Sequence, residues 1–223
     1  MSTVSQPHAT APLERFLTHC HRRRFPRNAV IISAGDVSND LYCLTAGSVT
    51  VLIEDDRGHE MVLAYLNPGD FFGEIGLFDE KRMRSAWVRA RSDCEIAQIG
   101  YGRLMELARN EPEIMFALLG QLSLRIRDTS RKARDLALKD VSGRVARALI
   151  DLATQPDAQP AHDGVMVRVT RQELGRIVGC SREMVSRVLG GLEEQGIISS
   201  VGRALVVHDP AVVRSTAARA RRG

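Results

Sequence analysis

The sequence predicts an α+β fold in which an N-terminal β-roll, similar to a jelly roll, is joined by a long helix to a C-terminal winged helix-turn-helix. Three observations lead to this fold: short strand-like runs between turn residues, one amphipathic stretch of more than twenty residues, and two short helical patterns on either side of Gly179. A chain of 223 residues is long enough for two modest domains with separate cores. We expect the β-roll over residues 1–110, the long helix over 111–138 and the winged helix-turn-helix over 139–223.

The N-terminal half is rich in short runs of β-branched and apolar residues. Turn-forming residues separate these runs, among them Asn67–Asp70, and Asp55–Gly58 has the composition of a hairpin turn with glycine at its end. Short strands at this spacing are typical of an all-β sandwich or barrel. The predicted strands are Ala29–Ile32, Leu41–Leu44, Ser48–Ile53, Glu60–Leu66, Ala86–Ala90 and Glu95–Ile99.

A single long helix is predicted after Glu111-Pro112, because a proline in the first turn of a helix costs no hydrogen bond. Apolar side chains recur at helical spacing as far as Leu138, beyond the length of a typical globular helix. We expect this stripe to pair with the same helix of a second copy of the chain. Packing on its own β-roll alone is the alternative. The stripe consists of Met115, Leu118, Leu119, Leu122, Ile126, Ala133 and Leu136.

The helical pattern breaks at Lys139-Asp140. Asp140 is placed to cap a new helix that runs to about Ala153. The following segment, Thr154–Gly164, is rich in proline, glycine and aspartate and is predicted to be a surface loop.

Two short helices joined by a tight turn are predicted between Thr170 and Gly196. Thr170 and Glu173 have the spacing of a capping box, Gly179 ends the first helix, and Ser181 is placed to cap the second. This arrangement is typical of a helix-turn-helix. The side chains expected to face inward are Leu174, Ile177, Val178, Val185, Val188, Leu189 and Leu192.

The outward face of the second helix points to a DNA-reading function. Counting from Arg182 at ~3.6 residues per turn, Glu183 lies at about 100° and Arg187 at about 140°, whereas the apolar side chains centre near 290°. An arginine can bind guanine O6 and N7, and a glutamate can accept a hydrogen bond from cytosine N4. These three residues lie near the helix N-terminus, the end that enters the major groove in this motif. An exposed charged face without a ligand would fit the charges but not the spacing.

The segments after Gly196 predict the wing, with Ile197–Ser200 and Ala204–Val207 as a hairpin. We expect non-specific contacts to DNA phosphates at the start of each helix and on the wing. The predicted phosphate-binding residues are Thr170, Arg171, Ser181 and Arg203.

The distribution of charge agrees with a polyanionic partner for the C-terminal part. Residues 1–138 contain 18 Lys+Arg and 18 Asp+Glu, whereas residues 139–223 contain 13 and 9, so the net charge of +4 lies in the last third. A solvated basic surface without a partner would have the same composition.

Other classes of function lack their signatures. The four cysteines are scattered without CxxC spacing, so we expect neither a disulfide framework nor a bound metal, including at His19-Cys20-His21. No apolar run approaches the ~20 residues of a membrane span, and the N-terminus has no secretory pattern. We therefore expect a cytoplasmic protein that does not contact the membrane.

A second constellation is a glycine-bracketed turn, Phe72–Leu77, followed by Arg84-Ser85. Free backbone N–H groups with one arginine can bind a single phosphodiester, and Glu74 can accept a hydrogen bond from a ribose hydroxyl. No paired carboxylates or metal ligands accompany Glu74, so an enzyme that processes cyclic nucleotides is disfavoured, and we expect that the protein is not an enzyme.

Three segments together resemble the catabolite activator (cyclic AMP receptor) branch of the Crp/Fnr family: GDFFGEIGLFDEKRMRSAWVRA from Gly69, VSGRVA from Val141 and TRQELGRIVGCSREMVSRVL from Thr170. The resemblance covers about Leu13–Val207. It implies a homodimer that binds palindromic double-stranded DNA under allosteric control and contacts RNA polymerase. It also implies a cyclic-nucleotide pocket, formed by Gly73, Glu74, Arg84, Ser85, Thr129 and Ser130, and base-reading residues at Arg182, Glu183 and Arg187.

Two positions depart from the cyclic AMP receptors, which have a serine at Ala64 and an apolar residue at Asp128. A carboxylate buried beside a purine costs several kcal/mol if it stays unpaired, and guanine offers Asp128 more donors than adenine does. Within the branch the chain looks closest to the CAP-like regulators of xanthomonads. That likeness implies an activator and repressor of virulence-type genes that binds DNA without ligand and is inhibited by cyclic di-GMP. Activation by cyclic AMP is the alternative.

One further departure concerns the contact with RNA polymerase. In this chain, Gln159–His162 replaces the loop through which the activator contacts the polymerase. Family members that sense redox state or haem have clustered N-terminal cysteines or axial ligands in the β-roll, which Cys20, Cys43 and Cys94 do not match.

Overall fold

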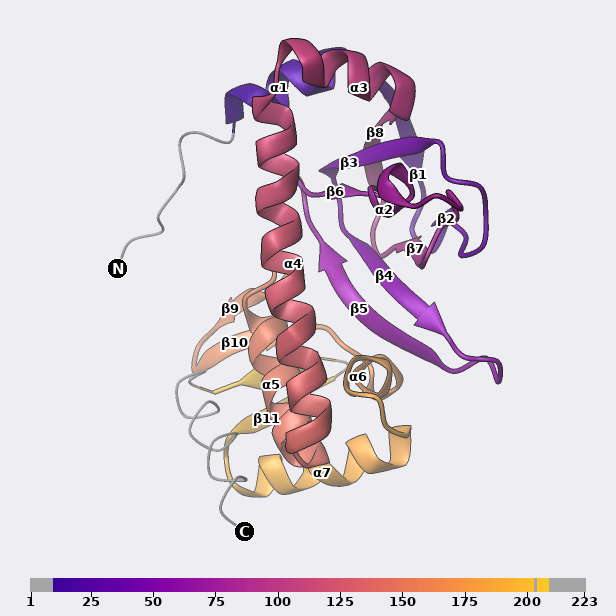
Figure 1. Ribbon diagram of the computed structural model, residues 1–223. Coiled ribbons are helices and arrows are strands. Elements are labelled where there is room, and N and C mark those ends of the chain that lie inside the picture. The colour runs from indigo at the N-terminus through magenta and orange to yellow at the C-terminus, as the bar shows by residue number, and fades with distance from the viewer. Residues whose placement is uncertain (1–9, 203, 209–223) are drawn as a thin grey trace. The chain divides into compact units, whose positions relative to one another are not determined.

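The computed structural model describes residues 10–202 and 204–208, and the chain divides into two compact units (Figure 1). The first unit comprises Met1–Ile53 and Leu63–Asp128, and the second comprises Glu54–Val62 and Thr129–Gly223. The tip of one hairpin of the β-roll therefore groups with the C-terminal unit. The predicted functional boundaries at residues 110 and 138 stay predictions.

Over its described residues, the first unit contains two four-stranded sheets, with strand orders β1-β8-β3-β6 and β2-β7-β4-β5. All six strands predicted from the sequence are confirmed, with bounds that shift by at most two residues. The strands are β1 (His21–Phe25), β2 (Val30–Ile32), β3 (Asp40–Ala46), β4 (Val49–Glu54), β5 (Glu60–Leu66), β6 (Phe71–Phe72), β7 (Trp87–Ala90) and β8 (Cys94–Gly100).

The central residues of β3 are buried on both faces of their sheet. On β3, Leu41 and Cys43 belong to a core shared with helices, whereas Tyr42 and Leu44 belong to the core that also contains Val49 and Val88 of the other sheet. Successive side chains of a strand point to opposite faces, so this strand reads as a continuous apolar run.

The sequence prediction missed β1. Its residues His21–Phe25 include three successive arginines and show no apolar alternation, but their backbone pairs with β8 along the whole strand. Arg22 Nη1 lies 2.7 Å from Glu95 Oε1 on that neighbouring strand. Cross-strand pairing rather than local hydrophobicity makes this segment a strand.

The long helix is confirmed as α4 (Glu113–Leu138), and its predicted apolar stripe is buried only in part. Leu118 is only 1% exposed and Met115 and Leu122 pack against the same core, whereas Ile126 is 67% exposed and Leu119 is also exposed. The helix packs part of the stripe against its own β-roll and leaves the rest of the stripe exposed. The other helices of this unit are α1 (Thr10–Thr18), α2 (Ile75–Phe78) and α3 (Tyr101–Asn110).

Over its described residues, the second unit combines the end of α4 and three further helices with a four-stranded sheet of order β11-β12-β10-β9. The predicted wing hairpin is confirmed as β11 and β12. The predicted loop Thr154–Gly164 is only partly a loop, because Gln159–Ala161 pairs with the next strand. The elements are α5 (Val141–Ala153), β9 (Gln159–Ala161), β10 (Gly164–Val167), α6 (Arg171–Val178), α7 (Arg182–Glu194), β11 (Ile198–Val201) and β12 (Ala204–Val207).

Along the described part of the chain, no helix is both long and apolar enough to cross a lipid bilayer. The same residues contain no group of three or more His, Cys, Asp or Glu side chains placed to bind a metal ion.

Candidate nucleic-acid interface and effector site

The predicted helix-turn-helix forms with the expected caps. The Thr170 hydroxyl accepts a hydrogen bond from the Glu173 N–H at 3.1 Å, and the Ser181 hydroxyl accepts one from the Met184 N–H at 3.3 Å. Gly179 ends α6 with φ +68°, a conformation that costs glycine little. A Cβ atom on Gly175 would lie 2.7 Å from the Cys180 carbonyl oxygen, so glycine also permits the close approach of the turn.

On α7 the buried and exposed faces separate as predicted. Val185, Leu189 and Leu192 are buried, whereas the base-reading residues Arg182, Glu183 and Arg187 are exposed. The tertiary packing of α7 therefore leaves the side chains that the sequence assigned to DNA reading available to a ligand.

Glu183 is held in its ionised form. A hydrogen bond from its own backbone N–H and another from the Ser181 hydroxyl, with the nearby Arg182 charge, lower the pKa of Glu183 from its ordinary value. An ionised carboxylate only accepts hydrogen bonds, which is the role that cytosine N4 requires.

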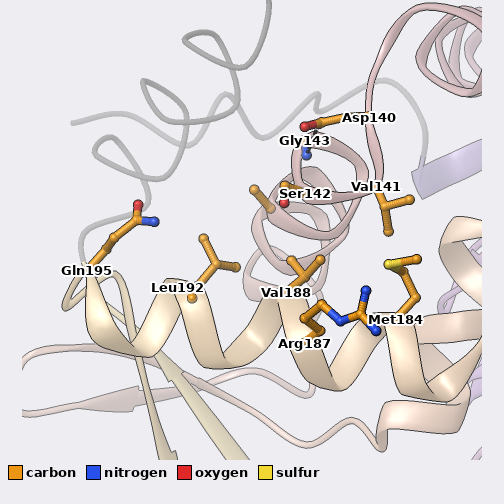
Figure 2. A pocket seen from close by; sticks show the side chains of 11 residues that line it. Asp140, Val141, Ser142, Gly143, Met184, Arg187, Val188, Leu192 and Gln195 are labelled. Carbon is orange, nitrogen blue, oxygen red and sulfur yellow. Dashed lines mark hydrogen bonds between the residues drawn. The ribbon is translucent and has the colours of Figure 1, made fainter. Parts of the chain in front are cut away.

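Arg187 borders a groove between the start of α5 and α7. The groove has a volume of about 430 Å³ and combines apolar side chains such as Val141 and Val188 with polar ones. Figure 2 shows Met184 and Arg187 on the side of α7 that faces Val141. Asp140 caps α5 as predicted, accepting a hydrogen bond from the Gly143 N–H at 2.8 Å. The base-reading helix and the first turn of α5 thus share one hollow.

Two of the four predicted phosphate-binding residues lie at a second hollow of about 350 Å³. Thr170, Arg171 and Arg182 line it together with Ser200 and Gly202 of the wing. The start of α6 and the wing therefore converge, as backbone-positioning contacts to DNA require. Ser181 lies between the two helices, with its hydroxyl engaged in the cap. The fourth predicted residue, Arg203, lies outside the described residues.

In the first unit, the glycine turn and Arg84 come together as the sequence predicted. Gly73 has φ +83°, and a Cβ atom on it would lie 2.5 Å from Arg84 Nη1. Glu74 and Arg84 are 6% and 8% exposed. Only glycine fits at residue 73, both in conformation and in space.

The Arg84 guanidinium is oriented by two carbonyl oxygens. Nη1 donates to the Gly73 carbonyl and Nη2 to the Asp40 carbonyl, each at 2.9 Å. The guanidinium also lies over the ring of Tyr42, 5.3 Å from its centroid. Because an arginine has five N–H donors, these two bonds leave three donors for a ligand.

Two residues of α4 that the sequence analysis did not assign hold the segment before the turn. Gln121 Nε2 donates to the Gly69 carbonyl and Gln121 Oε1 accepts from the Phe71 N–H. Arg125 bonds the Phe71 carbonyl, and its Nη1 lies 3.3 Å from Glu74 Oε1. Spacing was an available signal, because Arg125 follows Leu118 and Leu122 on the helix side that faces the β-roll.

The remaining predicted effector residues are not joined to this group by the structure. Ser85 is exposed, and Thr129 and Ser130 are exposed residues of the second unit. Their part in the pocket stays a prediction. Asp128 is exposed as well, so the burial cost that led us to expect a guanine ligand is absent in the protomer.

Comparisons with known proteins match a family model to each of the two regions of the chain. A cyclic nucleotide-binding domain matches residues 22–111, and a Crp-like helix-turn-helix domain matches residues 143–215. The chain is 54% identical over 198 residues to the cAMP-activated global transcriptional regulator Vfr of Pseudomonas aeruginosa, covering 87% of this chain and 92% of that protein. It is 47% identical over 205 residues to the cAMP-activated global transcriptional regulator CRP of Salmonella typhimurium, covering 92% and 98%.

Among solved structures, the chain is similar to the c-di-GMP responsive global regulator CLP of Xanthomonas campestris, described as linking cell-cell signalling to virulence gene expression. The TM-score is 0.83 and the sequence identity 43%, over 88% of this chain and 98% of that one. The matched relatives are transcriptional regulators, so the prediction that the chain is not an enzyme is confirmed.

Proposed function

Because the chain belongs to the Crp/Fnr family of cyclic-nucleotide-responsive transcription regulators, we propose that it binds palindromic promoter DNA as a homodimer controlled by a cyclic nucleotide. The observation that carries this proposal is the exposed Arg182, Glu183 and Arg187 face on a capped helix-turn-helix. The proposal extends to contact with RNA polymerase, through which such a regulator would activate or repress promoters.

The exposed face of α4 supports the homodimer. Phe116, Leu119, Ser123 and Ile126 are exposed and follow one another at intervals of three, four and three residues. This spacing is that of a coiled-coil seam. A symmetric dimer presents two recognition helices ~34 Å apart, one turn of DNA, which is why we propose a palindromic site.

The side chains around the glycine turn at Gly73–Gly76, called the effector turn below, favour a cyclic mononucleotide. Cyclic AMP is the first candidate. One buried guanidinium lies beside the Gly73 turn, and one arginine matches one phosphodiester. The relatives from P. aeruginosa and S. typhimurium are both described as cAMP-activated. In this case the nucleotide tightens DNA binding, because it binds the DNA-competent arrangement more strongly.

Cyclic di-GMP is the second candidate, favoured by the likeness to the X. campestris regulator. In this case the protein binds DNA without ligand, is released from the DNA by cyclic di-GMP and controls virulence-type genes. Cyclic di-GMP has two phosphodiesters and two guanines, so it requires donors beyond those of the Gly73 turn.

Fluorescence anisotropy of a labelled palindromic operator tests the proposal with protein alone, with cyclic AMP and with cyclic di-GMP. Weak binding that tightens at least tenfold with cyclic AMP supports the first candidate. Tight binding without ligand that is lost with cyclic di-GMP supports the second. No preference for the palindrome over a scrambled duplex under any of the three conditions would overturn the proposed function.

A further inference from the structure

Beneath the effector turn lies a buried pair of hydroxyl groups, those of Ser38 and Tyr101. Ser38 is 0% exposed and Tyr101 is also buried. The Tyr101 hydroxyl lies 2.5 Å from the Gly73 carbonyl oxygen and 2.5 Å from Ser38 Oγ. Tyr101 is the first residue of α3, and Ser38 lies between β2 and β3, so segments distant in sequence meet at the turn.

The direction of these hydrogen bonds follows from counting protons. A carbonyl oxygen only accepts, so Tyr101 donates its single proton to Gly73. Ser38 must then donate to the Tyr101 oxygen. The chain of donation runs from Ser38 through Tyr101 to Gly73, and each bond in such a chain polarises the next.

The Gly73 carbonyl connects this pair to Arg84. That oxygen accepts from both Tyr101 and Arg84 Nη1, which occupies both of its lone pairs. Tyr101 therefore helps to determine where the Gly73 oxygen lies, and the Gly73 oxygen helps to determine where the guanidinium lies.

The same pair supports the other end of the turn. A Cβ atom on Gly76 would lie 2.2 Å from Ser38 Oγ and 3.2 Å from the Tyr101 hydroxyl. The backbone of residues 73–76 thus rests directly on the two hydroxyl-bearing side chains.

We propose that Tyr101 and Ser38 are positioning residues of the effector site, whose hydroxyls fix the Gly73–Gly76 turn and, through Gly73, the Arg84 guanidinium for a nucleotide phosphodiester. This inference rests on the proposed function, because it assigns the turn to a cyclic nucleotide. It adds two residues that do not contact the ligand. They influence its affinity by fixing the positions of the turn and of Arg84.

The test compares Tyr101→Phe, Ser38→Ala and the control Tyr65→Phe in the full-length protein. Tyr65 is a tyrosine on β5 whose ring lies under Arg91, so its variant also loses a tyrosine hydroxyl but keeps the ring contact. Calorimetric titration with cyclic AMP and with cyclic di-GMP gives the affinity of each variant. We expect about tenfold weaker binding for Tyr101→Phe, about threefold for Ser38→Ala, and no change for Tyr65→Phe.

Hydrogen–deuterium exchange separates positioning from general packing and does not depend on a ligand. Tyr101→Phe should speed amide exchange in residues 71–78 and leave β3 and β8 at the wild-type rate. Faster exchange throughout β3 and β8 with a lowered Tm would make Tyr101 a packing residue and overturn the proposal. So would wild-type exchange in the turn together with wild-type nucleotide affinity.

The two proposals fail in different ways. If the wild-type protein binds neither nucleotide, the proposed effector control is wrong. The exchange measurement then decides by itself whether Tyr101 fixes the turn: unchanged exchange in residues 71–78 of Tyr101→Phe overturns the positioning role as well.

Discussion

The arginine of the effector turn and the arginines of the recognition helix belong to opposite environments. Arg84 is buried, and its guanidinium donates to two backbone carbonyls and lies over a tyrosine ring. Arg182 and Arg187 are exposed on α7. Both sites are suited to anionic ligands, but the β-roll orients its cation before the ligand arrives, whereas the helix-turn-helix leaves its cations in water.

The difference has an energetic cause. A buried charge is tolerated only with partners, so Arg84 must be bonded in the absence of ligand, and its geometry is thereby set. Exposed arginines need no partner and can adapt to base edges and phosphates over a large surface. A small ligand therefore meets a pre-organised site, and DNA meets an adaptable one.

Separating the two copies of the proposed homodimer is expected to have the largest effect, because it removes the second recognition helix and leaves the effector turn intact. Ile126→Asp places a charge on the exposed α4 seam and should yield a monomer with about 100-fold or greater loss of operator affinity. Sedimentation velocity and operator anisotropy measure the two effects.

Leu124→Asp is the matched control for that variant. Leu124 is 61% exposed, against 67% for Ile126, and side chains two residues apart on a helix point about 200° apart. We expect this variant to remain a dimer. A dimeric Ile126→Asp protein would rule out the seam.

Removing the buried arginine tests the pre-organised site. Arg84→Leu should weaken cyclic nucleotide binding by about 100-fold, since truncating a buried charged hydrogen-bonding group costs about 2–5 kcal/mol. Calorimetric titration measures this loss, with Arg103→Leu as a control for the loss of an exposed arginine. Wild-type nucleotide affinity in Arg84→Leu would place the effector elsewhere.

Removing an exposed arginine tests the adaptable site and should have a smaller effect. Arg187→Ala should weaken binding to the preferred operator by about 10- to 100-fold and reduce discrimination at one base pair of each half-site, because a bidentate contact contributes about 1–3 kcal/mol. Competition with operators carrying single substitutions measures the discrimination.

Arg171→Ala provides the contrast for that experiment, since a phosphate contact carries no sequence information. We expect it to weaken binding evenly across operators and to reduce the salt slope by about 1. Uniform weakening by Arg187→Ala as well would remove its assigned base-reading role.

The smallest expected effect concerns the interior of the β-roll. Burial raises the pKa of the Cys43 thiol from 9.0 to about 12. The folded protein therefore holds this proton more tightly than the unfolded chain does, and the resulting stability is present below about pH 9 and lost as the pH rises toward 12. Between pH 8.5 and 10 the wild type should lose about 1 kcal/mol more unfolding free energy than Cys43→Ala.

Urea unfolding at the two pH values measures that difference, with Cys180→Ala as the control in the helix-turn-helix. Burial also raises the pKa of the Cys180 thiol, but this residue is only half-buried. The loss of unfolding free energy in Cys180→Ala should therefore be closer to that of the wild type. Equal losses of unfolding free energy in the wild type and in Cys43→Ala would contradict a pKa raised by burial.

Local patterns in the sequence predicted the helix-turn-helix well because its determinants are close together in the chain. Thr170, Gly179 and Ser181 act on backbone groups within a few residues, and the structure shows all three in their expected roles. The outward face of α7 follows from helical periodicity alone.

Contacts between distant segments decided what the sequence could not show. The strand at His21–Phe25 exists because β8 pairs with it, and the pairing of Gln159–Ala161 with β10 replaced part of a predicted loop. The α4 stripe divided because one side of the helix packs on the β-roll, a partner that periodicity does not identify.

The sequence by itself determined the fold class, the long helix, the recognition face and the pairing of Gly73 with Arg84, since each depends on local spacing or on the chemistry of a small turn. Tertiary structure alone placed Gln121, Ser38 and Tyr101 around that turn. Hydrogen bonds between segments dozens of residues apart leave no periodic trace in the chain, and only the folded backbone brings their donors and acceptors within 3 Å of each other.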